Sequence, residues 1–141
     1  MPRASEPPVL LVKWYDLAKW LLERIESFPK SQRFVFGQRL ADRSMGLLET
    51  LVEATYSPAG PRKAGVLARA SRELETLRWL LRLAHERGLL TARQYQFACL
   101  RLAECGRMLG GWQRQASGRA GGSAAQDLGS PAPQEAPHPP A

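Results

Sequence analysis

Apolar residues recur at intervals of three and four along most of the chain. This spacing places side chains on one face of an α-helix, so the pattern predicts amphipathic helices rather than strands. The first apolar stripe joins Leu10 to Phe28, and the most regular one joins Leu67 to Ala84. The predicted helices span residues 9–27, 29–56, 61–87 and 91–114.

Residues that end or begin helices stand between these stripes. Pro29 follows the first stripe, and a residue that precedes proline avoids the helical conformation. Gly88 is placed to end the third helix in the left-handed conformation. Thr91, with Gln94 three positions later, has the capping-box pattern of a helix start. The pair Gly110–Gly111 indicates that the fourth helix frays near its C-terminal end.

Three short connections join the four predicted helices. Because short connections make neighbouring helices antiparallel, the expected fold is all-α, an up-down-up-down four-helix bundle. The prediction assigns residues 9–115 to this bundle and residues 1–8 to a loose leader. Residues 116–141 are mostly Ala, Gly, Ser and Pro, and such a composition cannot form a core. They are predicted to be a disordered tail, with a proline-rich, partner-binding tail as the alternative.

The first predicted helix is more apolar than a bundle requires. Twelve of the 17 residues from Val9 to Ile25 are apolar, whereas one buried helix face needs about three positions in seven. A large apolar surplus usually marks an interface, so the pattern predicts a homo-oligomer. The alternative is a monomer whose tryptophans fold over the bundle ends. The residues assigned to the oligomer interface are Trp14, Tyr15, Trp20, Phe34 and Trp79.

The chain shows no sign of a membrane span or of secretion. Lys13, Asp16 and Lys19 interrupt the most apolar stretch, and a span needs about 20 apolar residues in a row. No apolar signal-peptide core follows Arg3. Two cysteines are too few for a disulfide scaffold. The expected protein is therefore soluble and cytoplasmic.

Residues with catalytic or metal-binding chemistry are scarce. His85 lies in the last turn of a predicted helix, where a packing or capping role is expected. Cys99 and Cys105 are six positions apart on one helix, a spacing that suits neither a disulfide nor a zinc site. Cys105 also falls on the apolar stripe, which predicts a place in the core. The sequence therefore predicts no catalytic residue, no metal and no cofactor, and the protein is not expected to be an enzyme.

Positive charge is the most informative property of the chain. Lys and Arg number 20 against 13 Asp and Glu, so the net charge is +7. A basic helical surface is typical of proteins that bind nucleic acid, whereas cations paired with nearby acids form an ordinary solvated face. Arg82 has Glu86 one turn away; the other candidates have no obvious acidic partner in the sequence. The residues assigned to nucleic-acid binding are Lys30, Arg33, Arg39, Arg43, Arg62, Lys63, Arg78, Arg82 and Arg93.

The order and spacing of several short motifs carry a family resemblance. These motifs are Tyr15-Asp16-Leu17, residues 28–34, Leu51-Val52-Glu53-Ala54 with Tyr56, residues 81–85 with Leu89-Leu90 and Gln94-Tyr95, and residues 106–112. In them the chain resembles the Avd family, the accessory variability determinants of bacterial diversity-generating retroelements. It is similar, more loosely, to the four-helix proteins encoded in intervening sequences of bacterial 23S rRNA genes.

The resemblance implies a fold, partners and a role. It implies a homopentameric barrel of four-helix protomers with a basic surface, located in the bacterial cytoplasm. The implied partners are the retroelement's reverse transcriptase and its template RNA, and possibly DNA. Together they would support mutagenic reverse transcription and retrohoming, with no catalytic residue in the accessory protein. Two alternatives remain: a stand-alone bundle of the intervening-sequence type, and a protein-interaction bundle that binds no nucleic acid.

Overall fold

A computed structural model describes residues 8–121 of the protein, and every regular element within that range is helical. The elements are α1 (Val9–Glu26), α2 (Lys30–Gln32), the π-helical turn η1 (Arg33–Gly37), α3 (Gln38–Tyr56), α4 (Pro61–Glu86) and α5 (Ala92–Gly121). Because α2, η1 and α3 follow one another without a break, they form one long helical arm. The described chain thus has four helical arms, as the sequence predicts.

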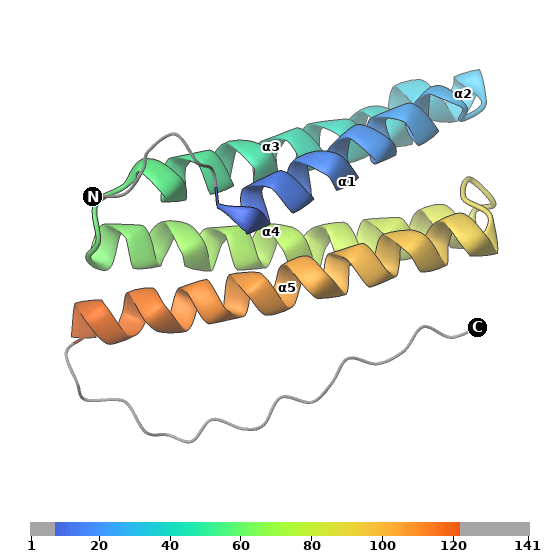
Figure 1. Cartoon of the computed structure of the whole chain (residues 1–141). Helices are drawn as coiled ribbons and strands as arrows, with labels where there is room; N and C mark the ends of the chain where they lie inside the picture. Colours follow the sequence, from blue (N-terminus) through green and yellow to red (C-terminus); the bar gives the residue numbers. More distant parts are fainter. Residues whose placement is uncertain (1–7, 122–141) are drawn as a thin grey trace.

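The four arms run alternately in opposite directions (Figure 1). α1 packs against α3 and α5, and α4 packs against α3 and α5. The α2 end of the molecule also holds the α4–α5 turn, while the α3–α4 turn lies at the other end (Figure 1). No helix within residues 8–121 is long and apolar enough to cross a membrane.

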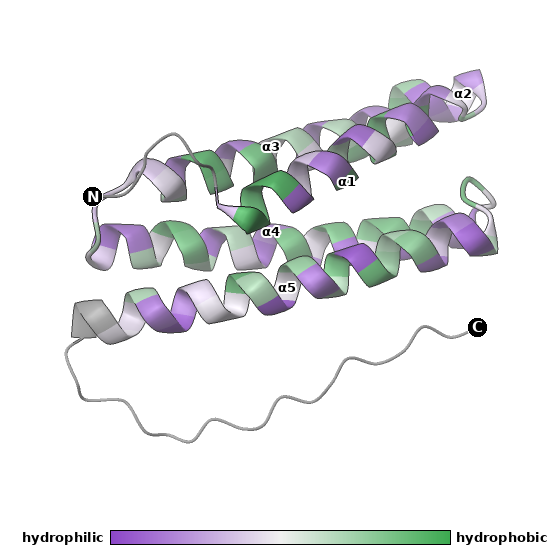
Figure 2. Cartoon of the chain, viewed as in Figure 1, coloured by the Kyte–Doolittle hydropathy of each residue, from purple (hydrophilic) through white to green (hydrophobic). Residues whose placement is uncertain are grey.

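The core lies along the inner faces of all four arms. Figure 2 shows that hydrophobic and hydrophilic residues alternate along each of them, which is the amphipathic pattern of a bundle. The largest fully buried side chains include Trp14 and nine smaller residues, mostly leucines. Burial of these leucines removes apolar surface from water. Each Å² buried stabilises the fold by about 25 cal/mol, and this is the main favourable term in folding.

Trp14 is a core residue, which corrects its assignment to an oligomer interface. Its side chain is fully buried within the protomer, and its indole N–H donates to the backbone carbonyl of Ser44 at 3.1 Å. The apolar ring fills the space between α1 and α3, and its one polar atom has a partner inside the bundle. Trp14 is therefore not available to a second copy of the chain.

The turn between α4 and α5 has the predicted geometry. Gly88 has φ of +80°, the left-handed conformation that glycine adopts without steric cost. The Gln94 N–H donates to Thr91 Oγ1 at 3.0 Å, and the Thr91 N–H donates to Gln94 Oε1 at 3.0 Å. These two bonds confirm the capping box at the start of α5.

The last helix is longer than predicted. α5 continues to Gly121, so the first six residues of the predicted tail, 116–121, are helical, and Gly110–Gly111 lies inside the helix rather than at a frayed end. The reason is tertiary: Trp112 packs against the core, and Ala116 is buried. These contacts outweigh the low helix propensity of glycine. The remainder of the predicted tail, and residues 1–7 of the predicted leader, lie outside the described residues.

Candidate nucleic-acid interface

Four of the predicted cations cluster in sequence on one helical arm. Lys30 lies in α2, Arg33 in η1, and Arg39 and Arg43 near the start of α3, and all four side chains are exposed. Within residues 8–121, no carboxylate lies within ion-pair distance of any of them. Cations without an acidic partner are free to bind phosphate oxygens through charge-assisted hydrogen bonds.

The two candidates in the middle of α4 are paired with acids. Arg78 Nε lies 3.3 Å from Glu75 Oε2, and Arg82 Nε lies 3.2 Å from Glu86 Oε2. The prediction that Arg78 lacks an acidic partner is therefore wrong, because Glu75 lies one turn away on the same face. The Arg82–Glu86 pair has the expected spacing. Both pairs are exposed to solvent, and such pairs contribute little to stability.

The remaining candidates lie at opposite ends of the bundle. Arg62 and Lys63 begin α4 beside the α3–α4 turn, and Arg93 begins α5 beside the α4–α5 turn. Lys63 Nζ lies 5.5 Å from the ring centroid of Trp112. Since α2 is at the same end as the α4–α5 turn (Figure 1), the nine predicted cations do not form one continuous patch. Arg93 shares an end with Lys30, whereas Arg62 and Lys63 are at the other end.

The predicted interface aromatics, Trp14 apart, have different environments. Tyr15, Phe34 and Trp79 are exposed. Trp20 is half-buried, and its ring packs against Phe97 at a centroid distance of 4.8 Å. The interface assignment leaves out other exposed apolar residues, among them Val35 and Tyr56. Both lie off the apolar stripe of their helix, and that position was the signal that could have found them.

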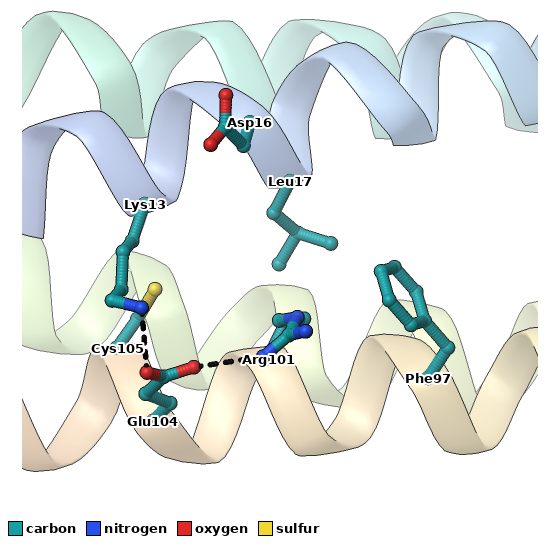
Figure 3. A pocket seen from close by; sticks show the side chains of 7 residues that line it. All are labelled: Lys13, Asp16, Leu17, Phe97, Arg101, Glu104 and Cys105. Carbon is teal, nitrogen blue, oxygen red and sulfur yellow. Dashed lines mark hydrogen bonds and ion pairs between the residues drawn. The ribbon is translucent and has the colours of Figure 1, made fainter.

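A groove of about 290 Å³ separates the outer surfaces of α1 and α5 (Figure 3). Its lining consists of Lys13, Asp16, Leu17, Phe97, Arg101, Glu104 and Cys105. Glu104 bridges two cations there: Lys13 Nζ lies 2.8 Å from one carboxylate oxygen and Arg101 Nη1 lies 3.1 Å from the other. The hydrogen bond from Lys13 is the main cause that lowers the pKa of Glu104, so this carboxylate stays ionised.

Cys105 lies at the floor of this groove, and its predicted place in the core is confirmed. Burial raises the pKa of its thiol to about 11, because the low-dielectric interior disfavours the thiolate. A neutral buried thiol is a poor nucleophile. Cys99, the other cysteine, is half-buried.

His85 packs at the end of α4, the role expected from its position. Its ring stacks on Tyr95 with centroids 4.5 Å apart, and its Nδ1 lies 3.3 Å from the Leu90 carbonyl oxygen. Partial burial of the Tyr95 side chain raises the pKa of its hydroxyl. Within residues 8–121, no three His, Cys, Asp or Glu side chains come together as they would at a metal site.

Comparison with known proteins identifies the family. The family described as bAvd-like matches residues 8–116. The searches of curated proteins and of solved structures returned no match. The family match extends from the start of α1 through most of α5, and it includes every cation and aromatic residue discussed above. This protein therefore belongs to the bAvd-like family.

Proposed function

We propose that this protein is a non-catalytic accessory protein of a diversity-generating retroelement. In this role it binds the reverse transcriptase together with template RNA or its cDNA, and supports mutagenic reverse transcription and retrohoming. Family membership supports the retroelement role. The observation that carries nucleic-acid binding is the exposed group Lys30, Arg33, Arg39 and Arg43, which has no acidic partner within residues 8–121.

In this proposal the basic surface acts as an electrostatic scaffold. Arginine and lysine side chains hold phosphates, and phosphate contacts position a nucleic acid without reading its sequence. Binding is then strongly salt-dependent, because each neutralised phosphate releases counterions. Arginine suits this role, since its planar guanidinium can make two hydrogen bonds to one phosphate.

We further propose that the protomers form a homo-oligomer, a pentamer by analogy with the family resemblance. Tyr15 on α1 and Trp79 on α4 supply exposed apolar surface for such contacts. An assembly of several protomers multiplies the positive charge and the number of phosphate contacts. Each added contact strengthens binding and steepens its salt dependence.

A pull-down with the cognate reverse transcriptase tests the retroelement role. The complex is treated with nuclease and washed at about 0.5 M salt, which suppresses bridging through charge alone. Retention of the enzyme supports the accessory role. Loss of the enzyme, with RNA binding kept at low salt, would indicate a stand-alone bundle of the intervening-sequence type. Loss of both would indicate a protein-interaction bundle.

Charge reversal on α3 tests the RNA surface. The double variant Arg39→Glu/Arg43→Glu is compared with Arg107→Glu/Arg114→Glu, which makes the same change in net charge at exposed positions of α5. We expect the α3 variant to weaken RNA binding more, and to lower the slope of log affinity against log salt by about one for each lost phosphate contact. Equal weakening by both variants would show that net charge alone governs binding and would contradict the assignment to α3.

A further inference from the structure

The helical arm between α1 and α3 contains one irregular turn. In η1 the Gln38 N–H donates to the Arg33 carbonyl, five residues earlier, which is the hydrogen bond of a π-turn. Gly37 ends this turn against α1. A Cβ atom at Gly37 would lie 2.9 Å from Ile25 Cγ2 and 3.4 Å from Phe28 Cδ2, so only glycine lets the backbone approach this closely.

This turn leaves two large apolar side chains in solvent. Phe34 is 68% exposed and Val35 is 73% exposed, while Gly37 is buried and Phe36 packs partly against the core. Residues 8–121 leave most of the surface of Phe34 and Val35 uncovered. An exposed aromatic and aliphatic pair of this kind typically marks a contact site.

Unpaired cations flank Phe34 along the helix. Lys30 lies four residues before it, Arg33 is its neighbour, and Arg39 lies five residues after it, in the first turn of α3. All three side chains are exposed and have no ion-pair partner within the described range. Exposed positive charge is therefore present both before and after Phe34 along this helical arm.

The ring of Phe34 also differs from most other exposed rings of the protein. Lys19 lies over Tyr15, Arg82 over Trp79 and Arg101 over Phe97, at 5.9, 5.5 and 5.2 Å from the ring centroids. No described cation lies over Phe34 in this way. Tyr56 is likewise uncovered and is 70% exposed, but no Lys or Arg lies within five residues of it on either side, up to Pro61.

We propose that Phe34 is a stacking residue for an unpaired base of a single-stranded nucleic acid, whose neighbouring phosphates bind Lys30, Arg33 and Arg39. This inference rests on the proposed nucleic-acid function and narrows it to single strands. Sites for single strands combine an aromatic ring with cations that follow the backbone. A duplex keeps its bases stacked on one another, so its bases do not reach Phe34. The phosphates of a duplex still bind the arginines.

Substitution of the ring, with retention of its apolar character, tests this assignment. Phe34→Leu keeps an apolar side chain but removes the aromatic face. Phe34→Tyr keeps the aromatic face. Tyr56→Leu is the matched control, because it removes an equally exposed ring that has no Lys or Arg within five residues along the chain. Each full-length variant is titrated with a 20-nucleotide single-stranded RNA and with the duplex of the same sequence at one salt concentration. The oligomeric mass is measured in parallel by light scattering.

We expect Phe34→Leu to weaken single-strand binding by about 5- to 150-fold, which corresponds to the loss of one base–aromatic stack. Duplex binding and the salt slope should not change, because the phosphate contacts remain. Phe34→Tyr should bind single strands as the wild type does, and so should Tyr56→Leu. Phe34 is exposed, so these substitutions should leave the thermal unfolding temperature unchanged.

Three results would overturn the inference. Unchanged single-strand binding by Phe34→Leu, while the wild type binds RNA, would refute the stacking role and leave the proposed function intact. A second result is that Phe34→Leu keeps its RNA binding but loses the reverse transcriptase in the pull-down or changes its oligomeric mass. Either change would assign Phe34 to a protein contact instead. Failure of the wild type to bind either the single-stranded RNA or the duplex would refute the nucleic-acid function itself, and the stacking role with it.

Discussion

The indole N–H of Trp14 on α1 donates to the backbone carbonyl of Ser44 on α3 at 3.1 Å, and both residues are fully buried. The Ser44 hydroxyl in turn donates to the Leu40 carbonyl at 2.9 Å. These bonds satisfy the polar atoms that a tryptophan and a serine bring into a leucine core. They also fix the position of α1 along α3, because the bond forms at only one register of the two helices.

Trp14→Phe should destabilise the fold without changing the assembly. The variant loses a buried hydrogen bond and leaves a small cavity, so the free energy of unfolding should fall by about 2–4 kcal/mol in urea titrations. Tyr15→Phe, at the exposed neighbouring position, should change it by less than about 0.5 kcal/mol. A reduced oligomeric mass for folded Trp14→Phe would contradict the placement of Trp14 wholly within the protomer.

Two glycines of the same helical arm should respond oppositely to alanine. At Gly37 the new methyl group would meet Ile25 Cγ2 at 2.9 Å, so Gly37→Ala should destabilise the protein by about 1–3 kcal/mol. At Gly46 nothing lies within 4 Å of the added atom, so Gly46→Ala should stabilise it by about 0.5–1 kcal/mol through helix propensity. Thermal unfolding of the two variants measures both effects. Equal shifts of the same sign would show that contact with Ile25 does not constrain Gly37.

The sequence predicts the helices well because their causes are local. Apolar spacing, the Thr91–Gln94 capping box and the left-handed Gly88 all act within a few residues. The π-turn was not predicted, because the close approach of Gly37 to Ile25 that accompanies it is a contact between two helices. The extension of α5 likewise depends on burial of Ala116, which no local propensity reveals.

The candidate site was predicted less completely. Residue type and charge single out cations that are mostly exposed, but they do not show which aromatic residues face the core. The interface assignment therefore includes Trp14, which is buried, and leaves out Val35, which is exposed. Arg78 is expected to lack an acidic partner, yet it pairs with Glu75. The choice among several acids and bases on one helix depends on side-chain conformations that a sequence does not specify.

Stability should depend on pH through the bridge made by Glu104. The folded chain lowers the pKa of this carboxyl from the usual 4.5, chiefly through the hydrogen bond from Lys13. A lowered folded pKa gives stability that is present above the unfolded pKa and is lost as the pH falls through the folded one. Glu104→Gln should therefore be less stable than the wild type at pH 7, by under about 1 kcal/mol because the groove is open to solvent.

Urea titrations between pH 7 and pH 3 measure the difference in free energy of unfolding between the wild type and Glu104→Gln. The gap between wild type and Glu104→Gln should narrow as the pH falls through the lowered pKa of Glu104. The stability gap between wild type and Lys13→Met should narrow in the same way. The double variant should lose less stability than the sum of the two single variants, because both substitutions disrupt the same ion pair. A gap that stays constant over this range would show that the bridge does not contribute through ionisation.

The two cysteines should differ sharply in reactivity. Burial raises the pKa of Cys105 to about 11, so at pH 8 only about one thiol in a thousand is ionised, and its side chain is also shielded from reagents. Cys99 is half-buried and should react first. A thiol reagent at pH 8 should therefore modify one cysteine per folded chain quickly and both in denaturant, with Cys99→Ser removing the fast phase. A fast phase that persists in Cys99→Ser would show that Cys105 is open to solvent and would contradict its place in the core.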